Sequence, residues 1–379
     1  MRRAAVVVID ACGAGALPDA GEYGDAGTNT LAHLAEAVGG LDLPVLGSLG
    51  LGSILPLRGV APAAAPVVHG RLAAQGHGKD STAGHWELMG VVSEAPAPTY
   101  PAGFPDEVVD ALRRATGHEF VANRPANGIA VLDDFGEEHL RTGALILYTS
   151  QDSVLQIAAH VDRVAPDELY AVCAAARELV DVGRVIARPF EGRPGDFRRT
   201  AGRRDFALAP PRESYLDALR DAGVAVHAVG KVDDLFAGRG IDRAHPGATN
   251  EAALASTGRL LHELEGGLIF TNLIETDQVY GHRKDVDGFH RALREIDAEV
   301  GRWMAQLRRD DLLIITADHG CDPAAAHSDH TREHAPLLAV VQPDRPGFRH
   351  DGALADVGAT VHRWLAGADA AGLPGRAFI

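Results

Sequence analysis

Six acidic and imidazole side chains in this sequence could together bind metal ions. Three apolar runs each end in an aspartate: AAVVVID (4–10), GLIFTNLIETD (267–277) and LLIITAD (312–318). Histidines follow the second and third runs, and one more lies in the segment HSDHTREH (327–334). Carboxylate and imidazole ligands without thiolate suit two divalent cations such as Mn²⁺, Zn²⁺ or Fe²⁺. The candidate ligands are Asp10, Asp277, His282, Asp318, His319 and His330.

The elements that must position these residues are short buried strands. Apolar runs of this length are typical of parallel strands covered on both faces, and open α/β sheets carry their sites at the carboxyl ends of such strands. Helical stretches such as ALREIDAEVGRWMAQL (292–307) separate the runs. We therefore predict an α/β fold with a mostly parallel sheet sandwiched by helices. Each aspartate alone could be an ordinary turn residue, but three strand ends with the same chemistry favour a shared site.

A second candidate feature is the segment GKDSTAGHWELMG (78–90), which places two hydroxyl residues at the expected start of a helix. A helix start offers free N–H groups and the positive end of the helix dipole to an anion. The alternative is an ordinary N-cap, which Ser and Thr often form. The segment is not a P-loop, because Lys79 is followed by Asp80. DACGAGALP (10–18) likewise fails the dinucleotide-binding pattern, since Pro18 stands where the third glycine belongs.

Proline-rich stretches divide the chain. EAPAPTYPAGFP (94–105) and ALAPPRE (207–213) cannot continue a helix or a central strand. We predict a discontinuous core formed by residues 1–93 and 211–379, with a second domain inserted at 94–210.

Composition narrows the class of protein. A chain of 379 residues that is 46% hydrophobic can form two globular domains. No apolar run approaches the roughly 18 residues of a membrane span, and the apolar stretch of MRRAAVVVID is too short for a secretion signal. The net charge of −16 argues against nucleic-acid and anionic-membrane partners. Three cysteines without CxxC spacing favour the reducing cytoplasm.

Four stretches of the sequence resemble the phosphopentomutase family of the alkaline phosphatase superfamily. They are GKDSTAGHWELMG, TDQVYGHRKDVDGF (276–289), TADHGCDP (316–323) with SDHTREHAP (328–336), and DACGAGALPDAGEYGDAGTNTLAHLAE (10–36). The resemblance extends over nearly the whole chain and implies an alkaline-phosphatase-like core with an inserted α+β cap. It further implies that Thr82 is phosphorylated. One Mn²⁺ would be held by Asp277, His282 and His330 and the other by Asp10, Asp318 and His319, although Zn²⁺ or another divalent cation would also suit these ligands.

The resemblance also assigns substrate contacts. YTSQDSVLQIAAH (148–160) is similar to the part of the cap that meets the sugar, which implies contacts from Ser150 and Asp152. Arg188 and Arg203 of the cap would face the distal phosphate, joined by Lys231 of the core, one of three lysines in the chain. For any one of the arginines in 184–204, the alternative is a solubilising surface role.

The expected activity is the interconversion of ribose or deoxyribose 1-phosphate and 5-phosphate through a phosphothreonine and a 1,5-bisphosphate, a reaction of nucleoside catabolism. A sugar bisphosphate would prime the enzyme, and the protein would be a monomer or weak oligomer with a small phosphosugar as its partner. One alternative is a related phosphomutase or phosphatase, such as the cofactor-independent phosphoglycerate mutase, which would use Ser81. Another is a metal-stabilised binding module without catalysis.

Overall fold

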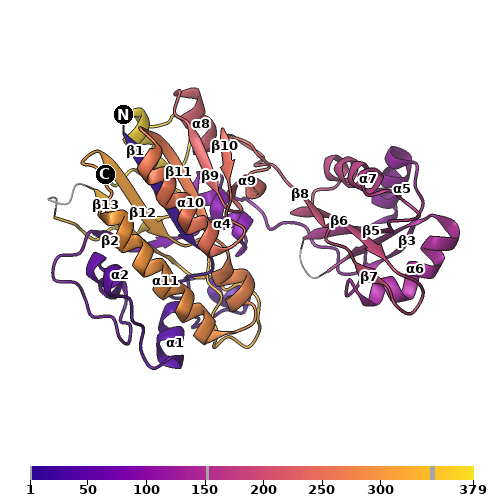
Figure 1. Cartoon of the computed structure of the whole chain (residues 1–379), viewed down its shortest axis with the longest axis horizontal. Helices are drawn as coiled ribbons and strands as arrows, with labels where there is room; N and C mark the ends of the chain where they lie inside the picture. The colour runs from indigo at the N-terminus through magenta and orange to yellow at the C-terminus, as the bar shows by residue number, and fades with distance from the viewer. Residues whose placement is uncertain (1, 151–152, 342–345) are drawn as a thin grey trace. The chain divides into compact units, whose positions relative to one another are not determined.

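The computed structural model describes residues 2–150, 153–341 and 346–379 and divides into two compact units (Figure 1). Met1–Ala95 with Pro210–Ile379 form the first, here called the core unit, and Pro96–Ala209 form the second, here called the cap unit. The sequence prediction placed the insertion at 94–210.

The core unit is built on one large sheet. Among the described residues this sheet has eight strands in the order β10-β9-β11-β1-β12-β13-β2-β14. Strands β1, β9, β10, β11 and β12 run parallel, and β13 is antiparallel to both of its neighbours. The strands are β1 (Arg3–Ile9), β2 (Val68–Ala73), β9 (Val226–Val229), β10 (Arg243–His245), β11 (Gly267–Leu273), β12 (Asp311–Thr316), β13 (Ala335–Val341) and β14 (Gly352–Ala353).

Helices cover both faces of this sheet, as Figure 1 shows for α10 and α11 on one face. Helices α1, α2, α10 and α11 pack together as one group, and α4, α8, α9 and α12 as another. The predicted α/β class with a mostly parallel, helix-sandwiched sheet is confirmed. The helices are η1 (Ala20–Tyr23), α1 (Thr30–Ala37), α2 (Pro44–Leu49), α3 (Leu51–Ile54), α4 (Ser81–Leu88), α8 (Tyr215–Asp221), α9 (Val232–Leu235), α10 (Asn250–Glu263), η2 (Thr276–Gly281), α11 (Val286–Met304) and α12 (Asp356–Ala366).

The cap unit has its own mixed sheet and its own core. In the part of the chain that is described, β3, β4, β5, β6 and β7 follow one another in the sheet, and β8 also pairs with β6. One apolar cluster lies between this sheet and helices α5 and α7, and a second lies under α6. The elements are α5 (Asp106–Thr116), β3 (Phe120–Pro125), α6 (Ala130–Thr142), β4 (Leu145–Thr149), β5 (Val154–His160), α7 (Pro166–Leu179), β6 (Arg184–Glu191), β7 (Arg198–Arg199) and β8 (Arg204–Ala207).

The three predicted strands are present as β1, β11 and β12, and every residue of each is buried. None of the described helices combines the length and apolar character that crossing a membrane requires.

Candidate functional site

The three aspartates predicted as ligands follow three adjacent parallel strands. Strand β1 lies between β11 and β12, and their registers pair Ile9 with Leu273 and Val8 with Thr316. The carboxyl ends of the three strands are therefore level. Asp10 directly follows β1, and Asp318 follows β12 after a single intervening residue. Asp277 lies in the π-helical turn η2 just beyond β11, a type of turn that is frequent at functional sites.

The structure brings the six candidate ligands together as two triads. Among the described residues, these are the two groups of His, Cys, Asp or Glu side chains close enough together to hold a metal ion. In the first, His282 Nε2 and His330 Nε2 lie 3.5 and 3.4 Å from Asp277 Oδ1. In the second, His319 Nε2 lies 3.3 Å from Asp10 Oδ1 and 3.5 Å from Asp318 Oδ2. The imidazole rings of His319 and His330 are 4.2 Å apart between centroids, so the triads are neighbours.

The donor atoms of both triads fit bound cations. Nδ1 of His282 faces the Ser328 carbonyl at 2.7 Å, and Nδ1 of His319 faces the Gly320 carbonyl at 3.0 Å. A proton on each Nδ1 leaves the Nε2 lone pair directed at a carboxylate, which is the usual arrangement of a metal-ligating histidine. Among the described residues, Asp277 Oδ1 and His330 Nε2 are buried without a hydrogen-bond partner, whereas Asp318 Oδ2 has His85 Nδ1 at 3.1 Å. Buried polar atoms without partners are costly, and a cation at the first triad would satisfy Asp277 and His330.

The electrostatics of the second triad favour positive charge. Burial of Asp318 works against its ionised form, but the charge of His319 and the contact with His85 lower the pKa of Asp318 below its ordinary value. Burial likewise opposes a charged His319, yet Asp318 and Asp10 raise the pKa of His319 well above its ordinary value. The triad therefore stabilises a proton on His319, and the negative charge that does so would equally attract a metal ion.

The hydroxyl that meets the triad belongs to Ser81 and not to Thr82. Ser81 Oγ donates a hydrogen bond to Asp10 Oδ1 at 3.3 Å and lies 3.2 Å from His319 Nε2. The N-cap of α4 is Asp80, whose Oδ1 accepts from the backbone N–H of Thr82 at 2.9 Å and from that of Ala83 at 3.1 Å. Neither hydroxyl is therefore needed to cap the helix. Asp80 contacts Thr82 through the Thr82 backbone N–H and not through its hydroxyl.

The sequence contains a signal for Ser81 that the prediction overlooked. Residues three and four positions apart share one face of a helix, so Ser81, Gly84 and His85 must face the same way. Gly84 lies so close to Asp318 that a Cβ atom would meet the Asp318 carbonyl oxygen at 2.5 Å. The face that contains Gly84 and His85 thus packs on the ligand Asp318, whereas Thr82 is turned about 100° away from Ser81 around the helix.

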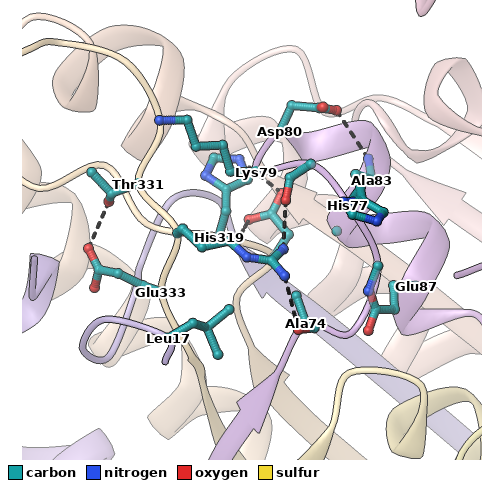
Figure 2. Close-up of a pocket in the computed structure, with 15 residues that line it drawn as sticks. Leu17, Ala74, His77, Lys79, Asp80, Ala83, Glu87, His319, Thr331 and Glu333 are labelled. Atoms are coloured by element: carbon teal, nitrogen blue, oxygen red, sulfur yellow. Dashed lines mark hydrogen bonds and ion pairs between the residues drawn. The ribbon is translucent and has the colours of Figure 1, made fainter. Parts of the chain in front are cut away.

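A pocket beside this helix start contains cationic groups that sequence reasoning did not single out as site residues (Figure 2). Lys79 lies on its wall with Nζ 3.1 Å from Asp25 Oδ2. Arg332 binds Asp19 Oδ2 at 2.9 Å through Nη2 and donates from Nη1 to the Gly78 carbonyl at 2.8 Å. Arg332 thus ties the loop before α4 to the rest of the pocket. A sequence signal existed for Lys79, because the chain has few lysines.

Comparison with known proteins identifies the family of the chain. A family model described as the Metalloenzyme superfamily matches residues 2–366. The phosphopentomutase of Caldanaerobacter subterraneus subsp. tengcongensis is 47% identical over 95% of this chain and 93% of its own length. That of Anaeromyxobacter sp. strain K is 49% identical over 96% and 95%, and that of Symbiobacterium thermophilum is 47% identical over 100% and 97%.

The chain belongs to the phosphopentomutase family. The resemblance recognised from four stretches of sequence is thereby confirmed. The substrate contacts that the resemblance implies lie mainly in the inserted segment, which is the cap unit.

In the cap unit, three arginines gather around a buried tyrosine hydroxyl. Tyr148 of β4 is fully buried, and the Arg199 side chain contacts its hydroxyl. Burial raises the pKa of Tyr148, while the charges of Arg188, Arg199 and Arg203 act in the opposite direction. Burial and the neighbouring Arg203 lower the pKa of Arg188. Guanidinium groups have the charge and the paired donors that suit binding of a phosphate or another anion.

Strand pairing explains this cluster and adds one residue to the prediction. Arg188 lies in β6, Arg199 in β7 and Arg203 just before β8, and both β7 and β8 pair with β6. Arg199 Nε donates to the Gly128 carbonyl at 3.2 Å, and Arg203 binds Asp205 through two contacts of 2.6 Å. Arg199 was not predicted.

The other three predicted substrate contacts are Ser150, Asp152 and Lys231. Ser150 directly follows β4. Asp152 lies outside the described residues. Lys231 is in the core unit at the N-cap position of α9, beyond the carboxyl end of β9, which pairs in parallel with β11.

Proposed function

We propose that this protein interconverts ribose 1-phosphate and ribose 5-phosphate, and the corresponding deoxyribose phosphates. Membership of the phosphopentomutase family makes the chain an isomerase that moves a phosphoryl group within its substrate. The observation that carries the proposal for this chain is the position of the Ser81 hydroxyl, within hydrogen-bond distance of Asp10 and His319 at the start of α4.

Ser81 is the phosphate carrier in this proposal, in place of the Thr82 predicted from the family resemblance. Phospho-Ser81 transfers its phosphoryl group to the free hydroxyl of a pentose monophosphate, so that one P–O bond to Ser81 breaks and one to the sugar forms. The product is the 1,5-bisphosphate. The phosphoryl group at the other position of this intermediate then returns to Ser81, which regenerates the phosphoenzyme and releases the isomer.

The surroundings of Ser81 suit this role. It is the first residue of α4, where backbone N–H groups and the helix dipole favour a phosphate. Asp277, His282 and His330 would hold one divalent cation, and Asp10, Asp318 and His319 the other, with Mn²⁺ proposed and Zn²⁺ equally suited to the donor set. When bound, such a cation pair supplies Lewis-acid polarisation of phosphate oxygens and charge neutralisation.

The cap cluster supports recognition of a substrate that carries phosphate. Arg188, Arg199 and Arg203 would bind the phosphate that is not being transferred, with Ser150 and Asp152 proposed as sugar contacts and Lys231 as a further phosphate contact. A bound, oriented phosphosugar keeps water from competing for the phosphoryl group.

The proposed role of the cap arginines can be tested by comparing the amounts of two products, inorganic phosphate and isomerised pentose phosphate. Arg203→Ala is expected to raise the ratio of inorganic phosphate released to pentose phosphate isomerised. The reason is that a weakly held bisphosphate either dissociates or lets water reach the phosphoryl group. Both products are measured in the same reaction. Arg198→Ala is the matched control, since Arg198 is exposed and pairs with Glu191 at 3.3 Å. An unchanged ratio in Arg203→Ala would count against the assignment.

The experiment that tests the function is a coupled assay of ribose 1-phosphate conversion. After chelation and removal of metal, isomerisation is expected to fall to background, because a serine hydroxyl loses its proton poorly at neutral pH without help. Mn²⁺ should restore activity, and a sugar bisphosphate primer should shorten any lag. Full activity in protein shown by elemental analysis to lack metal would contradict the cation assignment.

The same assay separates the nearest alternative. A serine carrier was the feature expected of a cofactor-independent phosphoglycerate mutase, but relatives of 47–49% identity over nearly the whole chain are named phosphopentomutase. Ser81 alone therefore does not favour that alternative. Conversion of 3-phosphoglycerate but not of ribose 1-phosphate would support it.

The proposed setting is the cytoplasm, with the protein a monomer or weak oligomer and without nucleic-acid or membrane partners. Cys12, Cys173 and Cys321 are buried free thiols, which supports a reducing compartment. The net charge of −16 supports the exclusion of polyanionic partners.

A further inference from the structure

A buried hydrogen-bond chain connects two ligands of the second triad behind the site. Asn272, in β11, donates from Nδ2 to Asp10 Oδ2 at 2.8 Å, and the same Nδ2 lies 3.2 Å from His85 Nε2. His85 Nδ1 lies 2.9 Å from the Ser81 carbonyl oxygen and 3.1 Å from Asp318 Oδ2. The side chains of both His85 and Asn272 are fully buried.

The donor and acceptor atoms of these hydrogen bonds can be assigned by starting from Asp10. Asp10 Oδ2 can only accept, so the Asn272 amide must present its NH₂ group there. The second hydrogen of that NH₂ group points to His85 Nε2, which therefore accepts. The proton of a neutral His85 is then on Nδ1, between the Ser81 carbonyl and Asp318 Oδ2. The two residues thus fix each other's orientation and reach Asp10, Asp318 and the backbone of Ser81 together.

The orientation of Asn272 lowers the stability of the fold, so a stabilising role does not explain why an amide is present at this position. With its NH₂ group turned to Asp10, Asn272 leaves Oδ1 buried and without a hydrogen-bond partner in the described part of the chain. A buried acceptor without a partner costs about 1–3 kcal/mol. An apolar side chain of the same size would avoid that cost, so the amide is better explained by what its NH₂ group holds in place.

We propose that His85 and Asn272 are positioning residues, which aim Asp10, Asp318 and Ser81 at a common point and so set the affinity of that triad for a divalent cation. The inference rests on the cation assignment of the proposed function. The close approach of Gly84 to Asp318 leaves no room for a side chain between them, because the helix that carries Ser81 and His85 lies directly on this ligand.

The test measures cation binding to metal-free protein and does not depend on activity. Asn272→Leu removes the unpartnered oxygen but also both donors, which leaves Asp10 Oδ2 and His85 Nε2 without the Asn272 amide. The melting temperature of the metal-free variant is therefore measured first, to show that it is folded. Calorimetric titration measures the dissociation constant for Mn²⁺ at the triad of Asp10, Asp318 and His319. In the variant this constant should rise about 10–100-fold, as is typical when the partners of metal ligands are lost. The level of phosphate on Ser81 after exposure to a sugar bisphosphate should fall in parallel.

Two histidine variants separate positioning from packing. His85→Leu should weaken Mn²⁺ binding as Asn272→Leu does, while His85→Asn keeps an amide near Nδ1 and should recover part of the affinity. His139 of the cap unit is the matched control, since it is fully buried, has Nδ1 2.8 Å from the Ala144 carbonyl and accepts at Nε2 from the His160 N–H at 2.9 Å. His139→Asn should lower the melting temperature and leave Mn²⁺ affinity unchanged.

Wild-type Mn²⁺ affinity in a folded Asn272→Leu or His85→Leu protein would overturn the positioning role and leave the proposed function intact. If wild type itself binds no divalent cation, both the positioning role and the cation assignment are overturned.

Discussion

Ser81→Ala is expected to lower the rate of pentose phosphate isomerisation by about a thousandfold or more, the scale seen when a nucleophile is removed. The reason is that Ser81 Oγ is the hydroxyl beside Asp10 and His319. Alanine is an excellent helix former, so the start of α4 should persist. The measurement is the steady-state rate of ribose 1-phosphate conversion in the presence of Mn²⁺.

The neighbouring residue supplies the control for this prediction. Thr82→Ala leaves the backbone N–H that Asp80 accepts from, so the cap of α4 is retained. Its isomerisation rate should stay within a few-fold of wild type. A large loss in Thr82→Ala, with activity retained in Ser81→Ala, would return the carrier role to Thr82.

Asp277→Asn is expected to have the second largest effect, through loss of one of two bound cations. Asp277 is buried, and its Oδ1 lies between the Nε2 atoms of His282 and His330. An amide retains the shape but not the charge that binds a cation. Loss of an outer partner of a ligand already costs about 10–100-fold, so loss of the ligand itself should lower the isomerisation rate at least 100-fold. Elemental analysis should show the metal content falling from two ions to one per chain.

Asp297→Asn controls for removal of a buried carboxylate. Asp297 is also buried, but it accepts hydrogen bonds from the backbone of α2, at 3.2 Å from Val45 N and 2.7 Å from Leu46 N. This variant should unfold more easily while keeping both cations. Two cations and normal activity in Asp277→Asn would remove that triad from the mechanism.

The ligand set could be predicted from sequence because it depends on features that sequence records well. Unbroken apolar runs mark buried parallel strands, and parallel strands share a carboxyl edge. The register that pairs Ile9 with Leu273 then brings Asp10 level with the turn that contains Asp277. Strand pairing alone therefore brings ligands that are far apart in the sequence to the same edge of the sheet.

Other parts of the site depend on geometry that composition does not record. Ser81 and Thr82 are adjacent hydroxyls, and only the helical spacing to Gly84 and His85 separates them. Asn272 is one polar residue inside a buried strand, and its contact with Asp10 depends on the pairing of Asn272 with Val8 across β11 and β1.

The cap arginines show the same limit. Many arginines lie between 184 and 204, and their number gives no reason to choose Arg199. The pairing of β7 and β8 with β6 selects it, by placing Arg199 and Arg203 beside Arg188 and the Tyr148 hydroxyl.

The most direct test of Ser81 as the phosphate carrier follows one phosphate group through the protein. Metal-loaded protein is incubated with a pentose 1,5-bisphosphate that carries labelled phosphate, the phosphopeptide is located by fragmentation mass spectrometry, and unlabelled ribose 5-phosphate is then added. If Ser81 carries the phosphate, label appears on Ser81 and is transferred to the sugar as fast as isomerisation proceeds. Label on Thr82, or isomerisation with no labelled protein, would contradict it.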